Sequence, residues 1–281
     1  MIFFFSFRNL ATKRHVLEKK PDTWNSGDPY EYFMGRWSRL MAPVFLNWLN
    51  LPLNLSWLDV GCGTGSLSEA IFRGSRPTYL CCVDPSWEFL QQAKDKHSFD
   101  ADFVAGSASE LPLSDNTFDV VVSGLALNFF PDLRRAITEM KRVLKEGGTL
   151  AAYVWDYSGK MEFLRLFWDA ASEVDVNANR LDEGIRFPIC NADNLRELFE
   201  QSGLTNIETA YADIDTVFND FDDYWNPFLG GQGPAPGYLA SLDTDIQEKI
   251  RRTLYNKLAS HTNVPIKLLA RAIAIRGVCG Q

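Results

Sequence analysis

The residues best suited to chemistry in this chain form one short glycine-rich run. Residues 58–65 read Leu-Asp-Val-Gly-Cys-Gly-Thr-Gly, so that an apolar segment passes directly into three alternating glycines. Glycine tolerates positive φ and has no Cβ, which lets backbone N–H groups approach a ligand closely at the positive end of a following helix. The run predicts a ligand-binding loop between a strand and a helix, with Asp59, Gly61, Cys62 and Gly63 at the ligand.

A second acidic residue, Asp84, ends the next apolar segment, about 20 residues beyond the glycines. In Rossmann-type proteins a carboxylate at this position accepts hydrogen bonds from ribose hydroxyls. Taken alone, Asp84 would be interpreted as a solvated residue at the end of a strand. With the glycine run upstream, a ribose-binding carboxylate is the favoured interpretation.

The glycine spacing bears on which ligand is bound. Dinucleotide loops have the pattern Gly-x-Gly-x-x-Gly and place a pyrophosphate at the helix N-terminus. Here the glycines are 61, 63 and 65, and Ser66 stands at the later position. Asp59 precedes the loop and no basic residue is near it in sequence, which favours a ligand with an amino group over one with phosphates. S-adenosylmethionine is such a ligand, and a nicotinamide dinucleotide is the alternative.

Residues 56–156 show the pattern of elements that would position this loop. Short apolar runs alternate with segments of helical periodicity, which is typical of strands joined by crossover helices in a parallel sheet. Most of the runs are apolar on both sides, as expected of strands covered by helices on each face. The predicted strands are residues 56–60, 79–84, 102–105, 118–123 and 149–155.

Two helices are predicted to flank this sheet. One begins after Gly65, and the clearer one covers residues 133–145, with Asp132 as its N-cap and Gly147 as its stop.

Beyond residue 156 the alternation weakens. A helix at residues 194–201, a strand at 206–217 and a last strand at 266–275 are predicted. Residues 218–263 between them are rich in aromatic side chains and contain a Gly/Pro turn cluster at 230–237. We interpret this segment as an insertion over the sheet.

Residues from about 32 to 208 resemble a class I S-adenosylmethionine-dependent methyltransferase of the small-molecule group often called type 11. The resemblance rests on residues 59–65 (DVGCGTG), 83–85 (VDP), 106–112 (GSASELP), and 118–123 (FDVVVS) with 142–148 (RVLKEGG). It implies an α/β, Rossmann-like, doubly wound fold. The expected sheet is mostly parallel and seven-stranded, with the last strand antiparallel, and carries the helical, aromatic insertion.

The resemblance also implies how S-adenosylmethionine would be bound. The glycine loop would line the methionine and ribose portion, with Asp59 near the amino group. Asp84 would bind the ribose hydroxyls and Pro85 would pack on the adenine. Ser107 and Ala108 belong to the loop that recognises the adenine edge, where family members commonly have Asp in place of Ser107.

Three further contacts are implied. Ser123 matches a strand-end position whose backbone approaches the methionine part, and a simple strand terminus is the alternative. Residues 32–37 resemble an N-terminal segment that closes over the cofactor, so Tyr32 and Arg36 are expected at the site. The Arg36 guanidinium would pair with the cofactor carboxylate. The alternatives are a solvated helix charge for Arg36 and a core anchor for Trp37.

The implied reaction is direct displacement of the activated methyl group by a small-molecule acceptor. Alignment and dehydration of the reactants lower the barrier without a base, so none is assigned. His15, His97 and His261 lie outside the motifs and are interpreted as surface or hydrogen-bonded residues. The alternatives are a cofactor-binding regulatory protein without turnover and an oxidoreductase that uses a nicotinamide cofactor.

The insertion is expected to cover the acceptor site. Its aromatic side chains could wall an apolar pocket, with the Gly/Pro cluster as a mobile lid, but ordinary core packing is the favoured interpretation of such side chains. These side chains are Phe218, Phe221, Tyr224, Trp225 and Phe228.

Composition narrows the class of protein. Hydrophobic residues make up 46% of the chain and charged residues 23%, which is typical of folded soluble proteins. The net charge of −8 disfavours binding to nucleic acid. The five cysteines are odd in number and lack metal-ligand spacing, which favours reduced thiols in the cytoplasm over a disulfide framework or a metal site.

Two regions are expected along the chain. Residues 1–28 are predicted to form an N-terminal tail and residues 29–281 the methyltransferase domain, with its cofactor-binding core at 54–156. The apolar start at residues 1–7 is too short and wrongly flanked for a typical signal peptide, and no apolar run approaches the roughly 20 residues that span a membrane.

Overall fold

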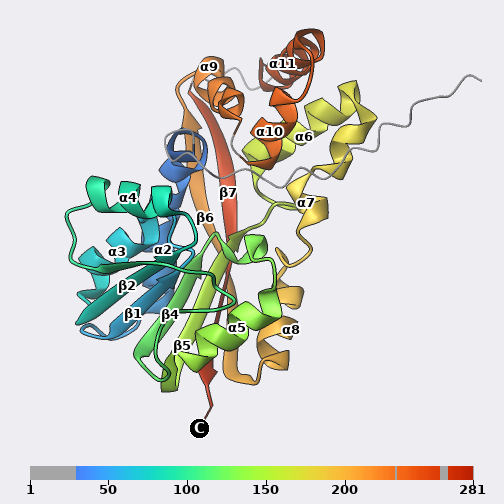
Figure 1. The fold of residues 1–281 in the computed structure, drawn as a ribbon. Coiled ribbons are helices and arrows are strands. Elements are labelled where there is room, and N and C mark those ends of the chain that lie inside the picture. Colours follow the sequence, from blue (N-terminus) through green and yellow to red (C-terminus); the bar gives the residue numbers. More distant parts are fainter. Residues whose placement is uncertain (1–29, 232, 260–264, 281) are drawn as a thin grey trace, which may run out of the picture.

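The computed structural model describes residues 30–231, 233–259 and 265–280. Within these ranges one seven-stranded sheet has the order β3-β2-β1-β4-β5-β7-β6 (Figure 1). Strands β1 to β5 run parallel, whereas β7 is antiparallel to both of its neighbours, β5 and β6. The strands are β1 (Ser56–Val60), β2 (Tyr79–Asp84), β3 (Asp102–Ala105), β4 (Phe118–Gly124), β5 (Leu144–Trp155), β6 (Leu204–Phe218) and β7 (Ile266–Cys279).

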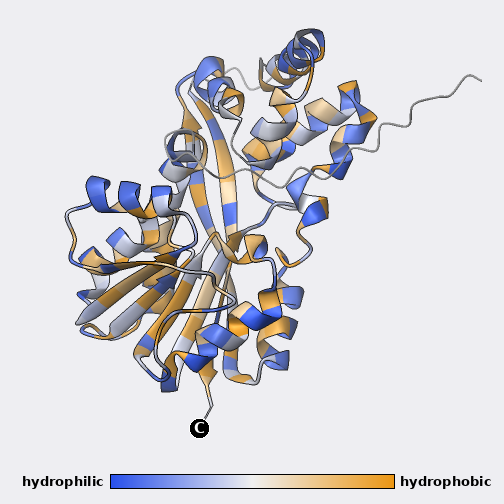
Figure 2. Cartoon of the chain, viewed as in Figure 1, coloured by the Kyte–Doolittle hydropathy of each residue, from blue (hydrophilic) through white to orange (hydrophobic). Residues whose placement is uncertain are grey.

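Helices cover both faces of the sheet. In Figure 1, α5 and α8 lie in front of it and α2 and α3 lie behind it. Figure 2 shows mainly hydrophobic residues on the central strands and many hydrophilic ones on the helices. The helices are η1 (Glu31–Gly35), α2 (Arg36–Leu49), α3 (Ser66–Ser75), α4 (Trp87–Lys96), η2 (Leu127–Phe129), α5 (Leu133–Arg142), α6 (Glu162–Val174), η3 (Val176–Arg180), α7 (Glu183–Arg186), α8 (Ala192–Gln201), α9 (Phe221–Trp225), η4 (Asn226–Gly230), α10 (Pro234–Ala240) and α11 (Thr244–Ala259).

This arrangement confirms the predicted doubly wound fold and its antiparallel last strand. All five residues of β1 are buried, as a strand covered on both faces requires. The chain order reverses between β1 and β4, which are direct neighbours. In open α/β sheets, ligands bind outside the carboxyl ends of the strands at such a reversal. The glycine loop follows β1 at this point.

Helix α5 ends earlier than the sequence predicts. The Asp132 side chain caps its start by accepting a hydrogen bond from the Arg135 N–H at 3.0 Å, as expected. At the other end Val143 is the C-cap, and its carbonyl accepts from the Thr117 N–H at 2.8 Å. This bond to the segment before β4 replaces a further helical turn. Gly147, with φ +73°, therefore lies in the irregular start of β5 and not at the helix end.

The insertion between β6 and β7 packs on α6. In Figure 1, α10 and α11 lie beyond the sheet next to α6, and α9 lies at the end of β6 and β7. The insertion ring of Phe228 stacks on Phe167 of α6 with centroids 4.5 Å apart, and Phe218 packs on Trp37 of α2 at 5.2 Å. Of the five aromatic residues that could have walled a pocket, Phe218, Tyr224, Trp225 and Phe228 are buried in this aromatic core.

Candidate active site

One cavity of about 360 Å³ opens at the carboxyl ends of β1, β2 and β4. Its volume lies at the lower end of the range of small-molecule sites. No residue of the insertion is among the described residues that line it. Eight of the eleven predicted site residues do line it, namely Asp59, Gly61, Cys62, Gly63, Asp84, Pro85, Ser107 and Ala108.

The glycine loop turns tightly against the end of β2. Gly61 and Gly63 have φ values of +74° and +53°, which favour glycine. The Gly61 N–H donates to the Val83 carbonyl at 2.8 Å. A Cβ on Gly61 would lie 2.6 Å from the Ala126 Cβ, whereas one on Gly63 would meet nothing within 4 Å. Gly61 is therefore required by packing, and Gly63 leaves the cavity open.

Asp84 connects the end of β2 to the glycine loop. One carboxylate oxygen accepts from the Gly63 N–H at 2.9 Å and the other from the Ser86 N–H at 2.8 Å. The side chain is buried, and this burial raises the pKa of Asp84 above its ordinary value. Each carboxylate oxygen has a second lone pair. The group is thus held rigidly at the cavity with capacity to accept further hydrogen bonds.

Asp59 is a buried carboxylate with an unsatisfied atom. Its Oδ2 accepts from the Ser68 hydroxyl at 2.6 Å, but its Oδ1 has no partner among the residues that the structure describes. Burial, together with the nearby Asp84, raises the pKa of Asp59 to about 7. A cation or hydrogen-bond donor in the cavity would satisfy Oδ1 and stabilise the ionised form.

The other three predicted residues lie outside the cavity lining. Tyr32 is 48% exposed. Ser123 is fully buried, and its neighbour Gly124 lines the cavity in its place. The Arg36 guanidinium donates to Asp223 of the insertion at 2.8 Å and lies over the rings of Trp37 and Phe218. Arg36 thus joins α2 to the insertion.

The N-terminal helices do border the cavity, but through a different face. Tyr30, Met34 and Ser38 line it, and they follow one another at intervals of four residues. A step of two positions along a helix corresponds to a rotation of about 200°. Tyr32 and Arg36 therefore point roughly away from the cavity that Tyr30, Met34 and Ser38 line. The spacing of these three residues was the signal that could have found this face.

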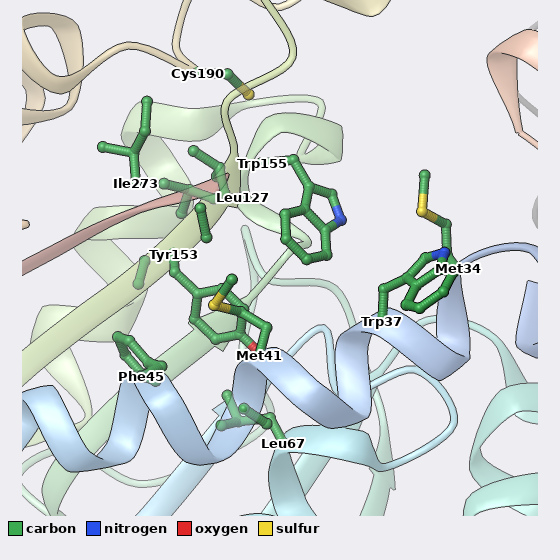
Figure 3. Close-up of a cluster of buried hydrophobic side chains, with 14 of the residues drawn as sticks. Met34, Trp37, Met41, Phe45, Leu67, Leu127, Tyr153, Trp155, Cys190 and Ile273 are labelled. Atoms are coloured by element: carbon green, nitrogen blue, oxygen red, sulfur yellow. The ribbon is translucent and has the colours of Figure 1, made fainter. Parts of the chain in front are cut away.

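Aromatic residues of β5 and of the turn that follows it form another wall, which the sequence analysis did not predict. Tyr153, Trp155 and Tyr157 alternate along the chain, and all three are buried and line the cavity. Alternate residues of a strand share one face. Figure 3 shows Trp155 extending from β5 toward Met34 and Trp37.

The turn after β4 completes the apolar part of the cavity. Leu125, Phe129 and Phe130 line it here. Leu125 has φ +60°, which is unusual for a bulky residue, and its N–H donates to the Tyr153 carbonyl at 2.8 Å. None of the described residues that line the cavity is Lys, Arg or His.

Glu31 fastens the N-terminal segment beside the glycine loop. Its carboxylate accepts the hydroxyl proton of Thr64 and forms ion pairs with Arg39 and Lys96 of α4. A Cβ on Gly35 would lie 2.6 Å from the Glu31 carboxyl carbon, so glycine makes room for this arrangement.

The remaining titratable candidates have structural roles. His97 is buried and contacts the Thr64 carbonyl at 3.0 Å and the Glu69 carboxylate at 3.1 Å. His15 and His261 lie outside the described residues. In the part of the chain that the structure describes, no group of three or more His, Cys, Asp or Glu residues could hold a metal ion. No described helix is long and apolar enough to cross a membrane.

The fold is Rossmann-like, and two buried carboxylates, Asp59 and Asp84, lie beside its glycine loop. Residues 58–152 match a family model described as a methyltransferase domain. A demethylmenaquinone methyltransferase from Staphylococcus aureus is 30% identical over 163 residues, which cover 53% of this chain and 68% of the relative. The chain belongs to the class I S-adenosylmethionine-dependent methyltransferases.

Solved structures agree with the fold. The YcgJ protein from Bacillus subtilis matches with a TM-score of 0.55 and 19% identity, covering 88% of this chain and 99% of that chain. Phosphoethanolamine N-methyltransferase 2 from Haemonchus contortus, solved in complex with S-adenosyl-L-methionine, matches with a TM-score of 0.55 and 15% identity. That match covers 90% of this chain and 56% of that chain.

Proposed function

We propose that this cavity binds S-adenosylmethionine through the eight predicted residues that line it, and that the chain methylates a neutral, largely apolar small molecule. The observation that carries the proposal is the unpartnered Oδ1 of buried Asp59, in a cavity without a described cationic side chain. An ammonium group can donate hydrogen bonds to these carboxylate oxygens. A pyrophosphate would instead face two carboxylates with no positive charge beside it. This disfavours a nicotinamide dinucleotide.

Each cofactor contact uses a group that the fold already positions. Asp84 accepts hydrogen bonds from the ribose hydroxyls, because its oxygens keep lone pairs beyond those used by Gly63 and Ser86. Asp59 binds the amino group through Oδ1. Pro85 and Ala108 supply apolar contact for the adenine, with Ser107 beside them.

The chemistry needs little more than placement. S-adenosylmethionine supplies a methyl group that its positively charged sulfur activates. The chain aligns the acceptor with that methyl group and excludes water from the cavity, which raises the effective concentration of the reactants. No histidine is among the described lining residues, so the proposal assigns no general base.

The apolar walls define the acceptor class. Leu125, Phe129, Phe130, Trp155 and Tyr157 offer ring and alkyl surface, with hydrogen-bonding groups only on Trp155 and Tyr157. The absence of a cationic side chain among the described lining residues disfavours a phosphate or carboxylate on the acceptor. The name of the Staphylococcus aureus relative, which specifies demethylmenaquinone, supports a small-molecule acceptor.

All five cysteines are free, which supports a cytoplasmic location.

The pH dependence of binding tests this proposal. Because the pKa of Asp59 is about 7 without ligand, the cofactor must displace its proton at lower pH. Affinity for S-adenosylmethionine is therefore expected to rise roughly tenfold from pH 5.5 to pH 7. Titration calorimetry in buffers of different ionisation enthalpy should detect proton release near pH 6. The Asp59→Asn variant should bind more weakly and lose most of this pH dependence; an unchanged profile would remove Asp59 from the site.

The same raised pKa has a consequence for ligand-free stability. The folded-state value of about 7 exceeds the ordinary value of 3.8, so folding favours protonated Asp59. Its contribution to stability is therefore present below pH 4 and is lost as the pH rises to 7. Asp59→Asn should flatten this part of the stability profile.

Arg36 provides a second test, because the structure gives it a role apart from the cofactor. The Arg36→Ala variant loses the bonds to Asp223 and the ring contacts, so its thermal midpoint is expected to fall by about 3–6 °C. Its affinity for S-adenosylmethionine should stay within about twofold of that of the original chain. Loss of a hydrogen bond to the charged cofactor would lower the affinity by more than that. A large loss of affinity with an unchanged thermal midpoint would show instead that Arg36 binds the cofactor.

A further inference from the structure

The amino-acid end of the cofactor carries a carboxylate as well as an ammonium group. Asp59 suits the ammonium, but the carboxylate requires a hydrogen-bond donor. Arg36, which the sequence reasoning assigned to it, is bound to Asp223. The Gly61, Cys62, Gly63 and Gly65 N–H groups are also occupied, because all four donate to acceptors within the protein.

The hydroxyls of Thr64 and Ser38 near this end of the cavity are engaged. The Thr64 hydroxyl donates a hydrogen bond to the Glu31 carboxylate, and the Ser38 hydroxyl donates one to the Met34 carbonyl at 3.1 Å. The Tyr30 and Ser38 hydroxyls lie 3.3 Å apart. A carboxylate could recruit none of these groups without breaking an existing bond. Ser66, at the start of α3, also lines the cavity and, besides Tyr153, is the other side chain with a hydroxyl that no described hydrogen bond engages.

Tyr153 differs from Thr64 and Ser38. Its ring packs on Phe45 of α2 with centroids 4.5 Å apart, and Figure 3 shows the ring beside Met41 and Phe45. A Cβ on Gly124 would lie 2.8 Å from the Tyr153 hydroxyl oxygen and 2.9 Å from Leu67 Cδ2. The hydroxyl thus lies over the end of β4 next to the first turn of α3, and Gly124 leaves the room for it.

The Tyr153 hydroxyl has no hydrogen-bond partner among the residues that the structure describes. The side chain is 2% exposed, and it lines the cavity. Burial, with Asp59 and Tyr30 nearby, raises the pKa of Tyr153 well above its ordinary value, so the group stays protonated. Because the hydroxyl takes part in no described hydrogen bond and its side chain lines the cavity, it can donate to a ligand without breaking an existing bond.

We propose that the Tyr153 hydroxyl donates a hydrogen bond to the carboxylate of bound S-adenosylmethionine, while Asp59 accepts from the ammonium. A donor and an acceptor side by side then match the two charges of an amino acid. This inference rests on the proposed cofactor site. It assigns Tyr153 as a binding residue that supplies the donor expected from Arg36.

The test compares ligands with and without the amino-acid end. Tyr153→Phe removes the hydroxyl and keeps the ring on Phe45. Calorimetric affinities for S-adenosylmethionine and S-adenosylhomocysteine should fall about tenfold to a hundredfold, as expected for one hydrogen bond to a charged group. The affinity for 5′-methylthioadenosine, which lacks that end, should not change. Tyr79→Phe is the control, since its hydroxyl donates to Asp102 outside the cavity at 2.8 Å.

The outcomes separate this inference from the cofactor proposal. Equal losses for all three ligands would overturn it, because the hydroxyl would then act on the fold or the adenosine end. Unchanged affinities would also overturn it and would assign the carboxylate to the first N–H groups of α3. The ligand-free thermal midpoint of Tyr153→Phe should be unchanged, since no described hydrogen bond is lost and the ring stays on Phe45. If the original chain bound none of the three ligands, the cofactor proposal itself would fail.

Discussion

Asp84→Ala is expected to weaken the binding of S-adenosylmethionine about a hundredfold, because two hydrogen bonds from ribose hydroxyls to a charged acceptor are lost. The same substitution leaves the Gly63 and Ser86 N–H groups without their acceptors, since Asp84 binds both. The glycine loop would then be less firmly held at the end of β2. Both effects act in the same direction, so the loss should be among the largest for any single substitution in the cavity.

Titration calorimetry checks this result against two further variants. Asp84→Asn keeps one oxygen acceptor and should lose less affinity than Asp84→Ala. Asp102→Ala removes a carboxylate from the neighbouring strand β3, where it accepts from Tyr79 outside the cavity, and should leave the affinity unchanged. Equal affinities for the original chain and Asp84→Ala would remove the ribose contact from the account.

Gly63→Ala is expected to reduce the affinity for S-adenosylmethionine roughly fiftyfold, because the added methyl group would occupy space that the ligand needs. Gly63 lines the cavity, and its Cβ would meet no protein atom within 4 Å. The backbone at φ +53° also disfavours alanine, at a cost of about 1–2 kcal/mol to the folded state. Binding and stability should therefore both fall.

A matched glycine separates the two effects. Gly147 has φ +73°, and a Cβ there also meets nothing within 4 Å, but it lies outside the cavity lining. Gly147→Ala should lower the thermal midpoint about as much as Gly63→Ala and leave cofactor affinity unchanged. If the two variants bound the cofactor equally well, the glycine loop would not contact the ligand.

Much of the scaffold could be predicted because its signals are local. Strands β1, β2 and β3 have the predicted bounds, since each is a short apolar run ended by a turn or a charged residue. The end of α5 was predicted three residues late. Val143 and Leu144 continue the helical spacing, but hydrogen bonds from the segment before β4 hold the chain there instead. Such bonds join residues far apart in sequence and leave no periodic signal.

The predicted site residues also divide into those with a local sequence signal and those that depend on contacts between distant residues. Those at or just after the ends of β1, β2 and β3 lie together, because the topology of the sheet brings these ends to one edge. Ser123, near the end of β4, is instead buried beside the cavity-lining Gly124. Tyr32 and Arg36 depended on the rotational phase of a helix, which packing decides. Asp223, the partner of Arg36, is 187 residues away along the chain. No short-range pattern could have predicted that ion pair.

The aromatic residues divide between core and cavity wall. Most of those in the insertion form ordinary core, and Phe228 packs on α6, a helix that the sequence did not predict although Phe163, Phe167 and Ala171 follow a helical spacing. Among the aromatic residues that line the cavity, Tyr153 and Trp155 share one face of β5, and Tyr157 follows in the next turn. Aromatic content alone did not distinguish core residues from cavity-lining residues. The two-residue spacing of Tyr153 and Trp155 would have indicated that both lie on one face of β5.

A crystal structure of the chain with S-adenosylhomocysteine tests the central claim most directly. The account predicts the ligand in the cavity beside the glycine loop, with both ribose hydroxyls within hydrogen-bond distance of Asp84 and the amino group at Asp59 Oδ1. A ligand bound elsewhere on the chain, or the same cavity filled by a phosphate-linked nucleotide in a competition soak, would contradict it.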